Sequence, residues 1–233
     1  MTYTNKHSNR KVYLSIVAIA ILVIAGFVAI YATNQPQPRP LHAEVGVRAG
    51  DTFTYSIIGT SEFAEAGIED TPGFDQYNQT DHYKITITDV DGPIVSMDAA
   101  WRFLNGTQIN YSQTIDVTNG NKGDADGFWA IYPANLTVSD LLRPFGGDGT
   151  KVNATSVSTY ADSKRETNFW FINNGFYDTS DPSLETLMYD YRNIYFDKIT
   201  GMLTSYDEYQ VFNNPQMQEV ISWRLISTSV WRV

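Results

Sequence analysis

The feature that most constrains this chain is the run from Val12 to Ala32, in which no side chain is charged. As a helix with a rise of about 1.5 Å per residue, this run spans roughly 30 Å, the thickness of a membrane's hydrocarbon core. Its two least apolar positions, Ser15 and Gly26, are tolerated in transmembrane helices. We therefore expect residues 12–33 to form a transmembrane helix, with the lipid bilayer as a partner.

A cleaved signal peptide is the alternative to such an anchor. Secretory signals usually have an apolar region of about 7–15 residues that ends in a small-x-small cleavage site. The apolar run here is longer, and Ile30-Tyr31-Ala32 and Tyr31-Ala32-Thr33 match that site poorly. The sequence favours an uncleaved signal anchor.

The charge divides sharply at the anchor. The residues before position 34 include Lys6, Arg10 and Lys11 and no acid, which leaves 13 of the 16 basic residues and all 26 acidic ones beyond it, a net charge of −13 there. Basic residues are retained on the cytoplasmic side of a span. We expect residues 1–11 to be a cytoplasmic tail and the C-terminal part to lie outside the cell. So acidic a surface repels nucleic acid, which we exclude as a partner.

Beyond the anchor, the sequence predicts a spacer and one folded domain. Residues 34–44 contain NQPQPRP, in which alternate prolines exclude both helix and central strand, so we expect an extended Pro-rich spacer. Residues 45–233, about 190 in all, suffice for one extracellular β domain. The chain has no cysteine, which excludes disulfides, thiol catalysis and cysteine metal sites, and a prokaryotic cell surface fits best.

Alternating apolar and polar residues predict strands throughout residues 45–233. From Val45 to Gly59, Phe53, Tyr55 and Ile57 alternate with Thr and Ser, and Asn105-Gly106 is typical of a tight hairpin turn. Further strands are expected at about 83–88, 95–103, 109–117, 152–160, 165–172, 187–196, 202–212 and 219–231.

The fold class predicted from this pattern is mainly β, a curved antiparallel meander sheet of about nine strands with one or two short helices, preceded by the transmembrane helix. One short helix is predicted from Asn135 to Leu142, before Pro144, and residues 60–81 are expected to form a loop or short helix that covers part of the domain. Periodicity leaves a half-barrel, a closed barrel and a sandwich open.

Five Asn-x-Ser/Thr sequons lie beyond the anchor and are candidate glycosylation sites. The asparagines are Asn78, Asn105, Asn110, Asn135 and Asn153.

Motifs for catalysis or metal binding are scarce. The only histidine in the predicted domain is His82, and the sequence holds no Gly-x-Ser-x-Gly, His-Glu-x-x-His or phosphate-binding loop. We predict no cofactor and no catalytic residue, although a carboxylate-pair hydrolase needs only two acids in a groove. Asp124-x-Asp126-Gly127 lacks the EF-hand spacing and is interpreted as a polar turn, so no metal site is predicted.

Aromatic side chains supply the candidate ligand-binding residues. Trp101, Tyr111 and Trp223 lie on the apolar sides of three predicted strands and are the candidates to line a cavity for an apolar ligand. The alternative for each is an ordinary place in the core. Arg102 and Arg165-Glu166 are expected to form surface ion pairs.

Four segments carry a resemblance to known proteins: VGVRAGDTFTYSI, ANLTVSDLL, YADSKRETNFW and YFDKITGMLTSYDEY. With these the chain resembles uncharacterised membrane-anchored archaeal surface proteins, in which a motif of the form Val-Gly-x-Gly-Asp-x-Phe-x-Tyr opens an extracellular β domain. The hairpin around Asp197-Lys198-Ile199-Thr200-Gly201 is similar to those of LolA/LppX-type lipoprotein carriers, which implies a curved sheet around a hydrophobic cavity. The lipobox cysteine of bacterial lipoproteins is missing here.

Three functions follow as expectations. The first is a non-catalytic, membrane-anchored surface protein with a binding or structural role and a surface protein partner. The second is a carrier or sensor that holds an apolar, lipid-like ligand in the concave face of a LolA-like sheet. The third is a carboxylate-dependent surface hydrolase.

Overall fold

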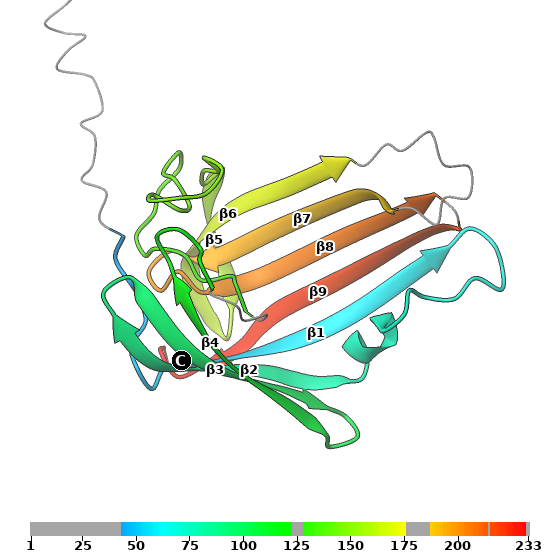
Figure 1. Ribbon diagram of the computed structural model, residues 1–233, viewed down its shortest axis with the longest axis horizontal. Helices are drawn as coiled ribbons and strands as arrows, with labels where there is room; N and C mark the ends of the chain where they lie inside the picture. Colours follow the sequence, from blue (N-terminus) through cyan, green and yellow to red (C-terminus); the bar gives the residue numbers. More distant parts are fainter. Residues whose placement is uncertain (1–42, 123–127, 176–186, 214, 232–233) are drawn as a thin grey trace, which may run out of the picture. The chain divides into compact units, whose positions relative to one another are not determined.

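Nine strands and one short 3-10 helix make up the regular structure in the computed structural model, which describes residues 43–122, 128–175, 187–213 and 215–231 (Figure 1). In chain order the elements are β1 (Thr52–Phe63), η1 (Phe74–Tyr77), β2 (Thr80–Asp91), β3 (Ile94–Phe103), β4 (Gln108–Asp116), β5 (Ala154–Tyr160), β6 (Ser163–Gly175), β7 (Leu187–Asp197), β8 (Leu203–Asn213) and β9 (Gln216–Thr228).

All nine strands belong to one antiparallel sheet with the order β4-β3-β2-β1-β9-β8-β7-β6-β5. The predicted mainly β class and the predicted number of strands are therefore confirmed. The first and last strands pair at the centre, with partners from Phe53↔Thr228 to Phe63↔Met217. The sheet is open, since β4 and β5 are its two edges, and so the closed-barrel and sandwich alternatives are wrong.

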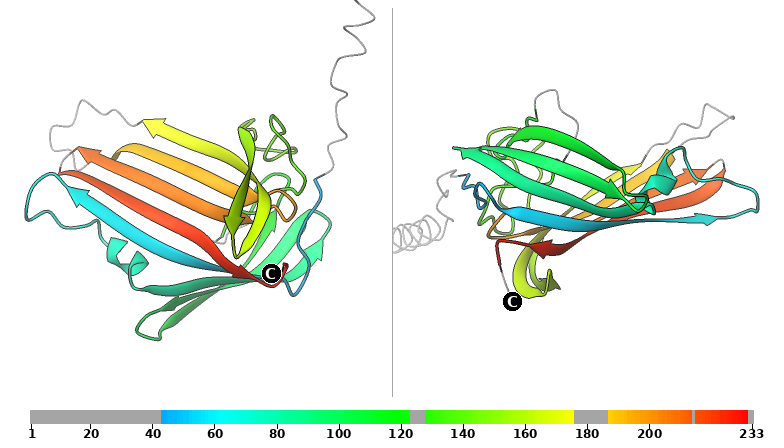
Figure 2. Two further views of the ribbon diagram at one scale, coloured as in Figure 1. Left: turned by 180° about the vertical axis from the view of Figure 1, so that it is seen from behind. Right: turned by 90° about the horizontal axis from the view of Figure 1, so that it is seen from below.

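The sheet is strongly twisted. Figures 1 and 2 show β2, β3 and β4 turning away from the plane of β1 and β6 to β9, so that the sheet is hollowed on one face. That face carries the core. In β1, Phe53, Tyr55 and Ile57 are buried, and in β3 Val95 and Met97 are buried on the same side as Trp101. The alternation of apolar and polar residues thus determines which side of each of these strands faces the core.

The connection from β4 to β5 packs against this face in place of a second sheet. Its buried apolar side chains include Val117, Phe128, Ala130, Ile131, Tyr132, Ala134, Leu136, Leu142 and Val152. It is attached to the sheet by an isolated bridge between Ile131 and Met202 and by a hydrogen bond from the Tyr132 amide to the Gly201 carbonyl, 2.9 Å.

The predicted helix from Asn135 to Leu142 is wrong, because the structure has turns there. Asn135 and Ser139 have φ of 60° and 74°, outside the right-handed helical region. The Asp140 carboxylate accepts hydrogen bonds from the Thr137 amide and hydroxyl at 2.7 and 2.8 Å, and such local bonds compete with helix formation. In the segment 60–81, η1 is the only helix that the described residues contain.

The turn between β7 and β8 is closed by a buried ion pair. Asp197 is fully buried and accepts a hydrogen bond from Arg165 Nε at 2.6 Å, so the prediction of a surface ion pair for Arg165 is wrong. Arg102 does lie at the surface, 3.6 Å from Asp81. At Gly201, with φ of 73°, a Cβ would lie 1.9 Å from the Tyr132 carbonyl oxygen, so this close approach requires glycine.

The predicted cytoplasmic tail and transmembrane helix (1–33), and nearly all of the predicted spacer, lie outside the described residues. Among the helices of the described part, none has the length and hydrophobicity needed to cross a membrane. The anchor and the location of the domain remain predictions.

Candidate functional site

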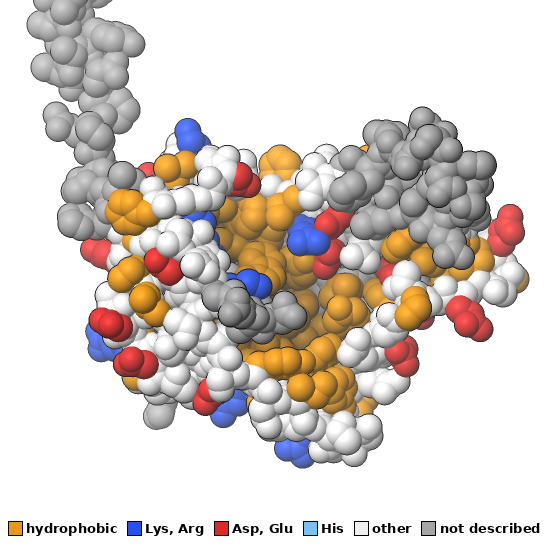
Figure 3. Space-filling view, viewed as in Figure 1, with side chains coloured by type: hydrophobic (Ala, Val, Ile, Leu, Met, Phe, Trp, Pro, Cys, Tyr) orange, Lys and Arg blue, Asp and Glu red, His pale blue; other side chains and the backbone are white. Residues whose placement is uncertain are grey.

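An aromatic cavity of about 280 Å³ lies on the core face of the sheet. Its walls come from η1, from β2, β3, β4, β8 and β9, and from the connection after β4. The lining residues are Tyr77, Tyr83, Trp101, Tyr111, Phe128, Trp129, Ala130, Leu203, Tyr206, Glu208, Ile221 and Trp223. Figure 3 shows hydrophobic side chains gathered in a hollow on this face. Twelve residues from distant parts of the chain thus share one concave surface.

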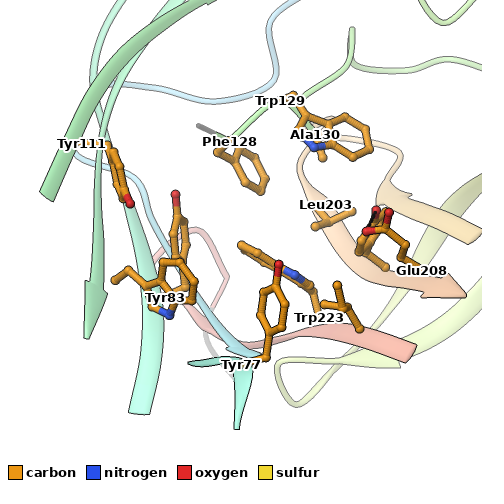
Figure 4. Close-up of a pocket in the computed structure, with 12 residues that line it drawn as sticks. Tyr77, Tyr83, Tyr111, Phe128, Trp129, Ala130, Leu203, Glu208 and Trp223 are labelled. Carbon is orange, nitrogen blue, oxygen red and sulfur yellow. Dashed lines mark hydrogen bonds between the residues drawn. The ribbon is translucent and has the colours of Figure 1, made fainter. Parts of the chain in front are cut away.

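The three ligand-binding candidates named from sequence, Trp101, Tyr111 and Trp223, all line this cavity. In Figure 4, Tyr83 and Tyr111 lie on one side of the cavity and Glu208 with Leu203 on the other, while Trp223 forms the floor between them. That these residues contact a ligand remains a prediction.

Ring contacts fix the aromatic wall. The Trp223 and Tyr83 rings meet edge to face with centroids 4.9 Å apart, and the Trp101 ring stacks on Tyr77 at 6.1 Å. Trp101 Nε1 donates a hydrogen bond to the Thr80 hydroxyl at 2.8 Å, which leaves its ring to face the cavity. Such contacts restrict the rotamers of the side chains that form the wall.

The roof of the cavity, Phe128–Ala130, is held by hydrogen bonds to its backbone. The Phe128 carbonyl accepts a hydrogen bond from Gln113 Nε2, and the Ala130 carbonyl accepts one from the Leu203 amide at 3.0 Å. Arg143 Nη2 donates to the Trp129 carbonyl at 3.1 Å. Burial of Gln113 on β4 is therefore explained by the roof that it supports.

Glu208 is the one acidic residue among the twelve that line the cavity. Its side chain is 12% exposed, and its Oε2 accepts a hydrogen bond from the Tyr206 hydroxyl at 2.7 Å. Its Oε1 lies 2.9 Å from Arg192 Nη2, and that guanidinium also makes two hydrogen bonds to Asp190, at 2.9 and 2.6 Å. Two carboxylates thus share one guanidinium.

The hydroxyls of Tyr77, Tyr83 and Tyr206 in the cavity have raised pKa values and are neutral at pH 7. Burial, assisted by neighbouring Tyr111, raises the pKa of Tyr83 to about 12. Burial and then the Glu208 carboxylate raise the pKa of Tyr206, and burial, Glu208 and Glu219 raise that of Tyr77. These hydroxyls act as neutral hydrogen-bonding groups.

A second cavity, of about 510 Å³, shares the lining residue Trp129 with the first. Basic side chains gather there: Lys122, Arg143 and Arg192, together with Asp148. Arg143 Nη1 donates to the carbonyls of Val117 and Ile131 at 2.8 and 2.7 Å, so its guanidinium supports the roof segment.

Sequence reasoning missed the polar end of the first cavity and its roof. Tyr83 and Tyr206 could have been found from their places on the apolar sides of their strands. Glu208 could not have been found in this way, because the polar residues Glu208 and Gln210 indicate exposed positions on a strand. No local sequence pattern shows that the roof segment passes above them.

All five sequon asparagines, Asn78, Asn105, Asn110, Asn135 and Asn153, are exposed. Asn105 lies at the tip of the β3–β4 hairpin, and its Oδ1 accepts hydrogen bonds from the Thr107 amide and hydroxyl at 2.9 and 2.7 Å. Asn135 Nδ2 donates to Glu44 at 2.8 Å. Glycosylation remains a prediction at all five positions.

Within the described ranges, no group of three His, Asp or Glu residues could hold a metal ion. The polar turn predicted at Asp124-x-Asp126-Gly127 lies outside those ranges. His82 is next to Asp81, with Nδ1 and Oδ2 3.0 Å apart, and neither lines the cavity.

Comparisons with protein-family models, curated proteins and solved structures found no match. The resemblances to archaeal surface proteins and to LolA/LppX-type carriers therefore stay predictions.

Proposed function

We propose that this chain is a membrane-anchored, extracytoplasmic binding protein whose β domain holds a small apolar or amphipathic ligand. The single observation that carries the proposal is the aromatic cavity on the hollowed face of the sheet. The sequence left a binding role and a structural role open. A purely structural protein needs no such cavity, because its core can pack to fill the space.

The chemistry of the wall supports an apolar ligand. Aromatic rings make up most of the lining. Two of their polar groups are bonded to protein: the Trp101 indole donates to Thr80, and the Tyr206 hydroxyl donates to Glu208. A ligand that displaces water from such a surface gains about 25 cal/mol for each Å² of apolar area that it buries. This arrangement suits a carrier or sensor with the open half-barrel form of LolA-like sheets.

The location outside the membrane is part of the proposal. It rests on the uncharged run at 12–33, the basic residues before it and the acidic remainder of the chain. Exposure of all five sequon asparagines agrees with an extracytoplasmic, glycosylated surface.

A hydrolase is not proposed. Paired-carboxylate hydrolysis requires two acids that flank the substrate. Glu208 is the cavity's one acid among the described lining residues, and Asp190 is held with it on the same guanidinium.

The test is native mass spectrometry of the full chain, purified in native-membrane nanodiscs, with organic extraction of bound molecules. We expect about one small molecule per chain, and its loss in the double variant Trp101→Ala, Trp223→Ala. The control is Trp231→Leu, which changes a tryptophan that packs on Arg165 rather than on the cavity. An empty wild-type cavity that also fails to take up added apolar compounds would refute the proposal.

A further inference from the structure

We infer that the ligand of the aromatic cavity is an organic cation, with a quaternary ammonium or alkylated amine group seated among the rings and Glu208 as its counter-charge. This inference rests on the proposed function and names the ligand class for the same site. It follows from four observations on the lining and its surroundings.

The first observation is the composition of the wall. Eight of the twelve lining residues are aromatic, and none of the twelve is Lys or Arg. The face of an aromatic ring carries partial negative charge and attracts cations, most strongly for Trp and Tyr, which supply seven of these eight rings. An apolar cavity built mainly of Leu, Ile and Val would hold a neutral hydrocarbon equally well but would not favour a cation.

The second observation is an uncompensated negative charge at one end of the wall. Asp190 and Glu208 bring two carboxylates to the single guanidinium of Arg192, and their side chains are 7% and 12% exposed. The pair of bonds between Arg192 and Asp190 satisfies that acid. One negative charge is left over in this group of three side chains, and Glu208, which also accepts a hydrogen bond from Gln210 Nε2 at 3.2 Å, is the only one of the three that lines the cavity.

The third observation is a corner that joins ring and charge. The Tyr206 hydroxyl donates to Glu208 at 2.7 Å, and the Tyr206 ring meets the Trp129 ring edge to face with centroids 5.8 Å apart. A cation placed beside Glu208 therefore contacts both aromatic and carboxylate groups. In so sheltered a place, water weakens the attraction less than it would at an open surface.

The fourth observation is the separation of charge between the two cavities. Lys122, Arg143 and Arg192 line the second cavity and none of them lines the first, so an anionic group would find its partners there and not among the rings. Beyond the anchor, the chain has a net charge of −13, which raises the local concentration of cations and lowers that of anions.

The experiment compares three probes of one shape on the full chain in nanodiscs of uncharged glycolipid, by calorimetry. The probes are phenyltrimethylammonium, its uncharged isostere tert-butylbenzene, and the anion para-tert-butylbenzoate. We expect phenyltrimethylammonium to bind about tenfold more tightly than tert-butylbenzene, and para-tert-butylbenzoate to bind most weakly.

The matched variants separate charge from shape. Glu208→Gln should remove most of the preference for the cation and leave the affinity for tert-butylbenzene within about twofold, because the cavity keeps its shape. The control Glu166→Gln removes a carboxylate that pairs with Lys198 away from the cavity, and its preference should match the wild type. Near-ultraviolet circular dichroism checks that both variants are folded.

Three outcomes overturn the inference in different ways. Equal affinity for phenyltrimethylammonium and tert-butylbenzene would leave the apolar cavity and remove the cation. Tightest binding of para-tert-butylbenzoate, lost in Lys122→Gln, would show an anionic ligand in the second cavity. Binding of none of the three probes would refute the proposed function together with the inference.

Discussion

The carboxylates of Asp197 and Glu208 have the same kinds of partner, an arginine and a tyrosine hydroxyl, in opposite surroundings. Asp197 accepts hydrogen bonds from Arg165 Nε at 2.6 Å, from the Tyr160 hydroxyl at 2.7 Å and from the Thr200 amide at 2.7 Å, and it is fully buried. Glu208 has Tyr206 at 2.7 Å and Arg192 at 2.9 Å, and it lines a cavity.

The difference lies in what covers each site and how its arginine is shared. The Arg165 guanidinium lies 4.0 Å from the centre of the Trp231 ring, which closes that site, and the described residues give it no second acid. Arg192 is divided between two acids beneath an open cavity. The same kinds of side chain thus fasten a turn at Asp197, where the charges balance and the site is covered, whereas at Glu208, where one charge is left over beside a cavity, we propose that they serve binding.

The largest expected effect is on stability at the closed site. Asp197→Asn leaves Arg165 without its counter-charge in a sheltered position, and we expect the free energy of unfolding to fall by about 3–5 kcal/mol, measured by chemical denaturation. Asp207→Asn is the control, since Asp207 pairs with the half-exposed Arg224 and should cost about 1 kcal/mol or less. Equal losses in both variants would contradict a special role for the closed site.

Acid should remove part of the same stability. Burial favours a higher pKa for Asp197, but the hydrogen bonds from Arg165, Tyr160 and Thr200 outweigh it and lower the pKa below its ordinary 3.8. Because the folded-state pKa is the lower one, the stabilisation is complete above the unfolded-state value and is lost as the pH falls through the folded-state value. In denaturation curves taken at several pH values, we expect the stabilities of wild type and Asp197→Asn to begin to approach each other below about pH 4 and to meet only below the folded-state pKa of Asp197.

Binding should distinguish two tryptophans that sit at the two sites. Trp223→Leu removes the floor of the cavity, and we expect the affinity for phenyltrimethylammonium to fall about tenfold, measured by calorimetry. Trp231→Leu uncovers Arg165 and should leave the affinity within about twofold while lowering stability by about 1–2 kcal/mol. If Trp231→Leu weakened binding as much as Trp223→Leu, the two sites would not be independent.

The smallest expected effect is on stability at the open site. Glu208→Gln leaves both bonds between Arg192 and Asp190 in place, so the free energy of unfolding should change by less than about 1 kcal/mol. Thermal unfolding followed by tryptophan fluorescence measures it. A loss as large as that of Asp197→Asn would mean that Glu208 fastens the fold and would weaken the comparison.

Much of the sheet follows from local sequence, because each strand has its own period of two. Phe53, Tyr55 and Ile57 are buried in alternation as predicted, and the Asn105-Gly106 hairpin is in place. The pairing of β1 with β9 could not be derived, because periodicity does not say which strands are neighbours. The helix predicted from Asn135 to Leu142 failed because burial of Leu136 and Leu142 against the sheet outweighs its modest helical propensity.

In the candidate site, too, the sequence predicts the residues that follow a strand's local pattern and misses those that are positioned by tertiary packing. Trp101, Tyr111 and Trp223 could be named from sequence because each lies on the apolar side of its strand, and the sheet places them on one face. The roof at Phe128–Ala130 and the acid Glu208 could not, since their positions depend on how the irregular connection from β4 crosses the sheet. Hydrogen bonds from Gln113 and Arg143 hold the roof segment in place, and neither residue stands out in the sequence.

The central pairing of β1 with β9 sets the order in which the domain can be completed. Strand β1 ends at Phe63 and β9 begins at Gln216, so the two halves of the sheet are joined only after β9 has been synthesised and has paired with β1. Until then β1 is an open edge with unpaired backbone groups, a surface on which chains aggregate. Folding of this domain is therefore governed by a late, long-range step, and its slowest phase should respond to changes in β9 more than to changes in the hairpins.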